Sequence, residues 1–153
     1  MIMSKKVLIV DDEAIIRDRM SDIATREGYH PLTASNGVEA LEILKADSVD
    51  LLLTDGQMPQ MGGIDLITLM TGRYNHKREE NAQKYFGGNV AEYDAFVEAR
   101  KSIPALMMSK DSDIVGRTAQ RVGALGCFPK SYDRSQPFDE GKLVETLRQY
   151  LSE

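Results

Sequence analysis

The sequence has little cysteine, no long apolar run and no excess of positive charge, and each absence excludes a class of protein. Cys127 is the single cysteine in 153 residues, so no disulfide can form within the chain, which suits a reducing compartment. No apolar stretch approaches the roughly 18 residues of a membrane span. Val7–Val10 is shorter than the roughly 7–15 apolar residues of a signal peptide. We therefore expect a cytoplasmic location and no membrane association.

The charge balance argues against nucleic acid as a direct partner. The chain carries 24 acidic and 19 basic residues, a net charge of −5. Such a chain is a poor candidate for wrapping polyanions or lying on anionic lipid. Its 42% apolar and 28% charged content is ordinary for a globular protein. The length suits one core, and we expect a single domain over residues 1–153.

Five short apolar runs predict strands. Val7–Val10 and Val49–Thr54 are continuous rather than alternating, which indicates strands buried on both faces, as in a parallel sheet. His30–Ala34, Ile103–Ser109 and Leu125–Pro129 are the other predicted strands.

Helical patterns separate these runs. Ile16, Met20, Ile23 and Ala24 share one helical face and precede Gly28, a residue typical of a helix end. Asn36–Glu39 is a variant of the capping box that opens a helix. Further helices are predicted at Ile64–Met70, Asp111–Val122 and Phe138–Leu151.

The alternation of strand and helix predicts an α/β fold. Repeated β-α units favour a parallel sheet with helices on both faces and right-handed crossovers. We expect five strands in the order 2-1-3-4-5, the flavodoxin-like doubly wound arrangement.

One segment is too long for this scheme. Val49 to Ser109 spans 61 residues, whereas a βαβ unit needs roughly 30. The surplus, at about 72–102, holds five of the ten aromatic residues and a second capping-box variant, Asn89–Glu92. We interpret it as an insertion between helix 3 and strand 4 that carries an extra helix. Its aromatic residues either form a partner-binding surface or pack the helix onto the domain, and we favour packing.

Chemically active residues stand at four predicted strand ends. Asp11 and Asp12 follow the first strand, Asp55 ends the third, Ser109 the fourth, and Lys130 follows the fifth. Ligands of doubly wound folds bind at the carboxyl ends of the strands. Each residue alone has an ordinary explanation, such as a helix cap or a solvated lysine, but their joint placement favours one site.

Three carboxylates in one cleft need a counter-charge, and Mg²⁺ prefers oxygen ligands and readily holds a phosphate oxygen as well. Asp55 would be the nucleophile that takes a phosphoryl group. The metal and Lys130 would neutralise charge on the transferred group, and the Ser109 hydroxyl would donate to it.

These motifs resemble the receiver domain of bacterial two-component response regulators, the CheY-like family. The matching segments are VLIVDDE at 7–13, ASNGVEAL at 34–41 and DLLLTDGQMPQMGG at 50–63. The resemblance covers nearly the whole chain outside the insertion.

The resemblance implies a role for each matched residue. Asp55 is the expected phosphoacceptor from a histidine kinase or phosphotransfer protein. Asp11, Asp12 and Asp55 with the Gln57 backbone carbonyl are the expected Mg²⁺ ligands. Ser109 is the expected switch hydroxyl, and Lys130 pairs with the phosphoryl group. The family remodels its helix 4–strand 5–helix 5 face on phosphorylation, here 111–151, and we expect partner or homodimer contacts there.

Three positions depart from the family pattern. Cys127 replaces the usual aromatic three residues before the lysine, and we interpret it as a small buried apolar residue. Ser131 replaces the proline that normally follows the lysine, so the loop must be shaped differently. Lys110 replaces a small residue beside Ser109, and it is either an ordinary solvated lysine or a residue that alters water access to the phosphoaspartate.

Other functions fit less well. A phosphatase of the haloacid dehalogenase type needs a second aspartate two residues after the first, where this chain has Gln57. A flavin mononucleotide carrier needs a phosphate-binding loop where Asp11–Glu13 would repel phosphate. A receiver that binds partners without phosphorylation remains the alternative. We expect a signalling module rather than an enzyme, either stand-alone or part of a longer regulator.

Overall fold

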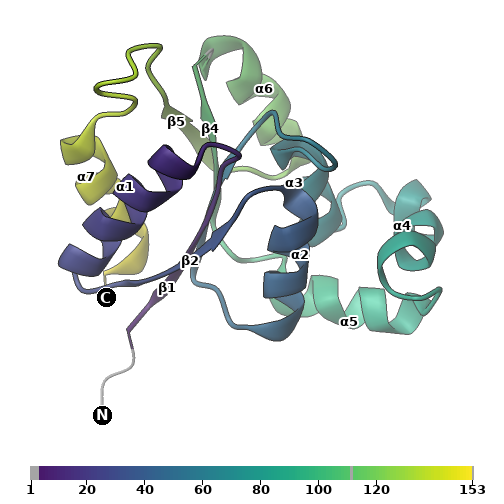
Figure 1. Ribbon diagram of the computed structural model, residues 1–153. Helices are drawn as coiled ribbons and strands as arrows, with labels where there is room; N and C mark the ends of the chain where they lie inside the picture. The colour runs from purple at the N-terminus through teal and green to yellow at the C-terminus, as the bar shows by residue number, and fades with distance from the viewer. Residues whose placement is uncertain (1–3, 111, 153) are drawn as a thin grey trace.

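A five-stranded parallel sheet forms the centre of the computed structural model, which describes residues 4–110 and 112–152 (Figure 1). The strand order is β2-β1-β3-β4-β5, and each neighbouring pair is parallel. The strands are β1 (Lys6–Val10), β2 (His30–Ala34), β3 (Leu51–Asp55), β4 (Ala105–Ser109) and β5 (Gly126–Pro129). The predicted flavodoxin-like doubly wound order is confirmed.

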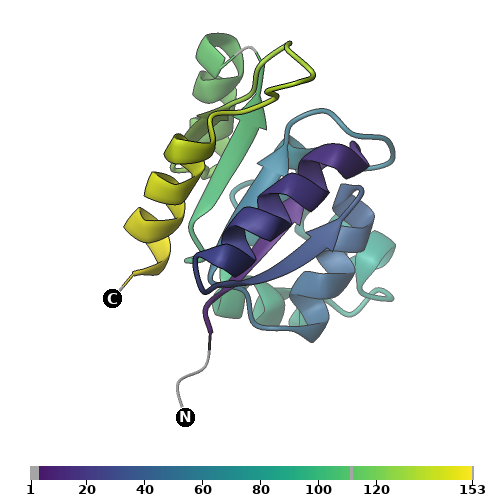
Figure 2. The same cartoon turned by 60° about the vertical axis from the view of Figure 1, so that its left-hand side comes forward.

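Helices bury both faces of the sheet. Val7 and Ile9 point into one apolar cluster with α1 and α7, whereas Leu8 and Val10 point into another with α2, α3 and α6. This alternation explains why the strand sequences are continuously apolar. Figure 2 shows α1 and α7 over the same face. The helices are α1 (Ala14–Arg26), α2 (Gly37–Ala46), α3 (Gly63–Thr71), α6 (Ser112–Val122) and α7 (Glu140–Leu151). The predicted start of the fourth helix at Asp111 lies outside the described residues.

Both predicted capping boxes cap helices. The Asn36 side chain accepts a hydrogen bond of 2.9 Å from the Glu39 amide, and the Asn89 side chain accepts one of 3.0 Å from the Glu92 amide. Glu39 reaches back to the amide of Ser35 rather than to that of Asn36. Polar side chains thus satisfy amides that the first helical turn leaves without partners.

The insertion contains two helices, not the single one predicted. The segment from Gly72 to Ser102 holds a 3-10 turn, η1 (Asn75–Lys77), then α4 (Arg78–Tyr85) and α5 (Val90–Arg100). The predicted helix is α5. The sequence did not reveal α4 because Ala82 is its one buried residue, so it shows no apolar stripe.

Aromatic side chains attach the insertion to α3. The Phe86 ring centroid lies 5.2 Å from those of Tyr93 and Phe96, and all three side chains are buried. The Tyr93 hydroxyl donates a 2.8 Å hydrogen bond to the Leu69 carbonyl of α3. Four of the five aromatic residues of the insertion pack against the core, Tyr85 only partly buried, which confirms the packing interpretation for them; Tyr74, 42% exposed, is the exception.

The insertion also caps the carboxyl end of α2. The Arg100 guanidinium donates to the carbonyls of Leu44 and Lys45 and lies over the Phe96 ring, 4.8 Å from its centroid. The Lys45 ammonium donates in return to the Tyr85 carbonyl. Figure 1 shows α4 and α5 at the right and lower right of the molecule, away from the carboxyl ends of the strands.

The ends of α3 and α6 are joined directly. The Thr71 hydroxyl lies 3.0 Å from the Val122 carbonyl oxygen and 2.8 Å from that of Ile67. Gly123 follows with a φ of 112°, and a Cβ atom there would lie 2.9 Å from the Thr71 methyl. Glycine therefore suits this close approach. No helix in residues 4–110 and 112–152 is long and apolar enough to cross a membrane.

Candidate functional site

The sheet register brings the predicted site residues to one edge. Asp55 pairs with Met108 across β3 and β4, and Ser109 pairs with Pro129 across β4 and β5. Lys130 follows Pro129, and its amide donates a 2.8 Å hydrogen bond to the Ser109 carbonyl. Because all strands are parallel, their carboxyl ends meet at the top of the molecule in Figure 1.

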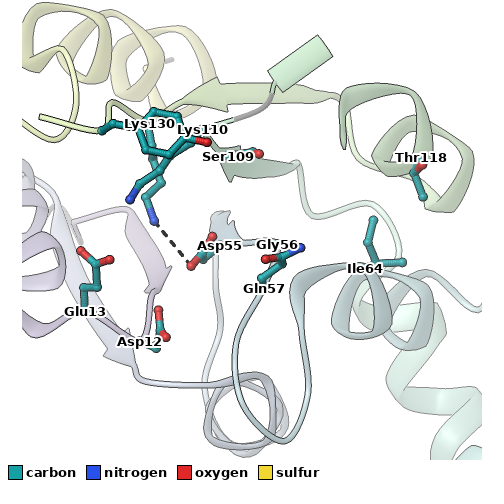
Figure 3. Close-up of a pocket in the computed structure, with 11 residues that line it drawn as sticks. Asp12, Glu13, Asp55, Gly56, Gln57, Ile64, Ser109, Lys110, Thr118 and Lys130 are labelled. Atoms are coloured by element: carbon teal, nitrogen blue, oxygen red, sulfur yellow. Dashed lines mark ion pairs between the residues drawn. The ribbon is translucent and has the colours of Figure 1, made fainter. Parts of the chain in front are cut away.

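A cavity of about 500 Å³ opens at this edge (Figure 3). Its lining includes six residues that the sequence singled out: Asp12, Asp55, Gln57, Ser109, Lys110 and Lys130. Glu13 and Tyr132 also line it, and neither was predicted as a site residue. Tyr132 lies two residues beyond Lys130, and in an extended chain residues two apart point to the same side, so the spacing could have indicated a place near Lys130. Asp11 is fully buried beside the cavity.

Lys130 connects two of the carboxylates. Its ammonium nitrogen lies 3.0 Å from an Asp11 oxygen and 3.5 Å from an Asp55 oxygen. The exposed fractions of the side chains are 4% for Lys130, none for Asp11 and 13% for Asp55. In such a site an ion pair is poorly screened, so Lys130 strongly affects the charge of both acids.

Hydrogen bonds from the start of α1 hold Asp11 in place. Its second carboxylate oxygen accepts a 2.9 Å hydrogen bond from the Glu13 amide, at the start of α1. Its carbonyl accepts a 2.6 Å hydrogen bond from the Arg17 guanidinium. The buried acid thus has partners on both carboxylate oxygens, which burial of a charged group requires.

Burial dominates the electrostatics of the site. It raises the pKa of Asp55 to about 6, while Lys130 opposes the shift and Asp11 adds to it. Burial also raises the pKa of Asp11 against the Glu13 amide and Lys130. For Lys130, burial lowers the pKa, but attraction to Asp11 and Asp55 outweighs it and the net pKa is raised. Lys130 therefore stays cationic at neutral pH, and Asp55 is mostly ionised.

The loop after β3 fixes the position of Asp55. The Gly63 amide, at the start of α3, donates a 3.1 Å hydrogen bond to the Gly56 carbonyl. A Cβ atom on Gly63 would lie 2.4 Å from the Asp55 carbonyl oxygen, so only glycine permits this contact. The first turn of α3 is therefore packed directly against the backbone of Asp55.

The donor set fits a divalent cation. Asp11, Asp12 and Asp55 each offer a carboxylate oxygen within 4.8 Å of the others, and Lys130 is the cation paired with two of them. Three carboxylates against one ammonium leave negative charge in the cluster. Hard oxygen donors of this kind suit Mg²⁺. Gln57 lines the same cavity, and the role of its carbonyl as a ligand stays a prediction.

The region around Cys127 differs from the interpretation drawn from the sequence. Cys127 is partly exposed, not buried, because β5 is one of the two edge strands of the sheet. Burial still raises the pKa of its thiol. Phe128 is the buried aromatic instead, and its ring centroid lies 6.3 Å from that of Phe138. Phe128 thus points away from its cysteine neighbour, as successive residues of a strand do.

Comparison with known proteins decides the family. A model of the response regulator receiver domain matches residues 7–78. The chain is 39% identical over 149 residues to sporulation initiation phosphotransferase F of Bacillus subtilis, an alignment that covers 97% of this chain and 95% of that protein. The chain belongs to the response-regulator receiver family.

Other relatives agree with this membership of the receiver family. Over 66 residues the domain is 47% identical to the chemotaxis protein CheY of Thermotoga maritima, an alignment that covers 42% of this chain and 55% of that protein. The solved structure of CheY4 of Vibrio cholerae matches with a TM-score of 0.69 and 26% identity, and covers 97% of this chain and all of that one. Receiver domains are signalling modules that take phosphoryl groups from sensor kinases or phosphotransfer proteins.

Proposed function

We propose that this receiver domain accepts a phosphoryl group on Asp55 from a histidine kinase, a phosphotransfer protein or a small phosphodonor, and relays the signal through a change of shape. The observation that carries the proposal is the placement of Lys130 between Asp11 and Asp55 in a cavity at the carboxyl edge of the sheet. A buried acid with an adjacent ammonium is arranged for phosphoryl transfer, in which catalysis is mainly positioning and charge neutralisation.

The transfer needs an ionised Asp55. With a pKa of about 6, its carboxylate is the main form at neutral pH. One carboxylate oxygen attacks phosphorus, a P–O bond to Asp55 forms, and the bond from phosphorus to the donor breaks. Lys130 neutralises charge on the phosphoryl oxygens, and the Ser109 hydroxyl, which lines the same cavity, donates to one of them.

Asp11, Asp12, Asp55 and the Gln57 backbone carbonyl would hold Mg²⁺. When bound there, the ion would neutralise part of the charge on the phosphoryl group. Asp12 is exposed to solvent, while Asp11 is buried and already paired with Lys130. We therefore assign Asp12 and Asp55 the larger share of the metal binding and Asp11 the additional task of orienting the lysine.

The output surface is proposed on α6, β5 and α7, the face that corresponds to helix 4, strand 5 and helix 5 of the simple receiver fold. Ser109 and Lys130 stand at the ends of β4 and β5, so a change at the phosphoryl group acts first on this face. A downstream protein, or a second copy of the chain, would bind there. The domain would extend over residues 1–153 with its insertion at about 72–102.

The acceptor is tested by intact mass after incubation with Mg²⁺ and acetyl phosphate. The parent protein should gain the mass of one phosphate, and chelation of the metal should abolish the gain. Asp55→Asn should carry no phosphate, whereas Asp65→Asn, a change of an exposed aspartate in α3, should behave like the parent. A parent protein that never gains phosphate would contradict the proposal and favour a receiver that binds its partners without phosphorylation.

A further inference from the structure

The connection between β5 and α7 is a closed hairpin. Lys130 and Phe138 form an antiparallel bridge, and the Ser131 amide donates a 2.7 Å hydrogen bond to the Pro137 carbonyl. The intervening residues therefore project as a loop beyond the carboxyl edge of the sheet, as Figures 1 and 2 show for the yellow-green segment before α7. The loop stands beside the acceptor cavity because Lys130 is part of both.

Polar contacts hold the loop in one position. An Asp133 carboxylate oxygen accepts hydrogen bonds from the Ser135 amide, at 2.9 Å, and from the Ser135 hydroxyl, at 2.7 Å. The Arg19 guanidinium of α1 donates a 3.0 Å hydrogen bond to the Ser135 carbonyl. The loop is thus closed at its base and tied to a neighbouring helix.

The loop places Tyr132 at the cavity. The tyrosine is 70% exposed, so it adds little to the apolar core. The Lys110 ammonium lies 5.0 Å from the centroid of its ring, and both side chains line the cavity that contains Asp55. A cation over an aromatic ring is attracted to it, which holds the two side chains together.

Lys110 and Tyr132 line the same cavity as Asp55, so they stand where water can approach a phosphoryl group on that residue. The Asp55 side chain is 13% exposed, so a group attached to it would extend toward the cavity opening. In hydrolysis a water oxygen attacks phosphorus opposite the Asp55 oxygen. The P–O bond to Asp55 breaks, its carboxylate is regenerated, inorganic phosphate leaves, and the proton lost by water passes to solvent. The attacking water therefore comes from the open side of the cavity.

We infer that Tyr132 and Lys110 together form a cover that slows access of water and small phosphodonors to Asp55. Tyr132 acts as a positioning residue that keeps the Lys110 side chain across the opening. The inference rests on the proposed phosphorylation of Asp55 and extends it to the lifetime of the phosphorylated state. A barrier to access slows both the loss of phosphate to water and its gain from a small phosphodonor. A group that stabilises bound phosphate slows the loss but does not slow the gain.

The test compares the parent with Tyr132→Ala, Tyr132→Phe and Lys110→Met. Protein is phosphorylated with acetyl phosphate and Mg²⁺, the donor is removed by rapid desalting, and loss of phosphate is followed by intact mass. Tyr132→Ala and Lys110→Met should each accelerate loss of phosphate and its gain from acetyl phosphate, by about threefold, the scale of a cation–π contact. Tyr132→Phe keeps the ring and should restore the parent rates.

Tyr74→Ala is the matched control, since Tyr74 is an exposed tyrosine in the insertion. If the parent gains phosphate but Tyr132→Ala shows the parent rates, the inferred cover is wrong and the proposed function stands. Faster loss combined with slower gain would also overturn the cover, because that pattern indicates lost stabilisation of phosphate rather than easier access. A parent that never gains phosphate would overturn the proposed function itself, so the two failures are distinguishable.

Discussion

The cavity at Asp55 and the insertion at 72–102 differ in what they bury. The cavity region buries charged groups, and the insertion buries aromatic rings. In the cleft, Asp11 and Lys130 are buried as charges and depend on each other. In the insertion, buried rings such as Phe96 supply the contacts, and Arg100 remains near the surface over a ring and a helix end. The chemistry proposed for the cavity therefore depends on single side chains, whereas the stability of the insertion is shared among many contacts.

The largest effect is expected from removing the ammonium of the cleft. Lys130→Met should slow phosphorylation of Asp55 by about a hundredfold, because a group that neutralises transferred charge is lost. The rate with acetyl phosphate measures it. Lys142→Met, in an exposed lysine of α7, is the control. An equal rate in Lys130→Met and the parent would mean that the cleft does not depend on this charge.

The corresponding change in the insertion should affect stability rather than chemistry. Phe96→Ala should lower the free energy of unfolding by about 3 kcal/mol, because it leaves a cavity among buried rings. Urea denaturation measures the loss, with exposed Glu98→Ala as control. The phosphorylation rate of the folded variant should match the parent. A large change in that rate at full folding would show that the two regions are coupled.

Because the pKa of Asp55 is raised in the folded protein, the free energy of unfolding depends on pH. Its folded pKa is about 6 and its model value 3.8, so the native state binds this proton more tightly than the unfolded chain. Stability is therefore lost as pH rises from about 4 to about 6. Asp55→Asn removes the ionised group and should be more stable than the parent at pH 8, on the order of 2 kcal/mol.

The gap between Asp55→Asn and the parent should shrink as pH falls through 6 toward 4. Thermal or urea unfolding at each pH measures it without Mg²⁺, and Asp65→Asn serves as the control. A gap that is constant over this range would contradict the assignment of the raised pKa to Asp55. Added Mg²⁺ should stabilise the parent more at pH 8 than at pH 5, since protons compete for the carboxylates.

The smallest effect is expected at the helix end that the insertion caps. Arg100→Met should reduce the free energy of unfolding by about 1 kcal/mol, since it removes hydrogen bonds to the Leu44 and Lys45 carbonyls. Chemical denaturation again measures it. Replacement of exposed Lys101 by Met is the neighbouring control. A loss as large as that of Phe96→Ala would show that capping, not ring packing, holds the insertion in place.

The sequence predicts the sheet and the site because their signals are local. Continuous apolar runs mark buried parallel strands, and the residues after them, such as Asp11 and Lys130, fall at one edge by topology alone. The caps at Asn36 and Asn89 were predictable because a side chain and an amide three residues apart form each one.

The remaining features depend on contacts that the sequence does not display. Helix α4 is polar and buries Ala82 alone, so no periodic signal marks it. The hairpin after Lys130 arises from its pairing with Phe138, eight positions away, which no motif announces. Cys127 is partly exposed because its strand ends the sheet, a property of the strand order rather than of the residue.

The clasp between Thr71 and Val122, with Gly123 packed beside it, fixes one end of α6 to α3. The opposite end of that helix follows Ser109, at the cleft. A displacement that starts at the cavity would therefore rotate α6 about its carboxyl end at Val122. The amino end, about 16 Å away along the helix, would move farthest. A partner bound near the amino end of α6 would therefore meet a large displacement of its binding surface, and one bound near Val122 would meet almost none.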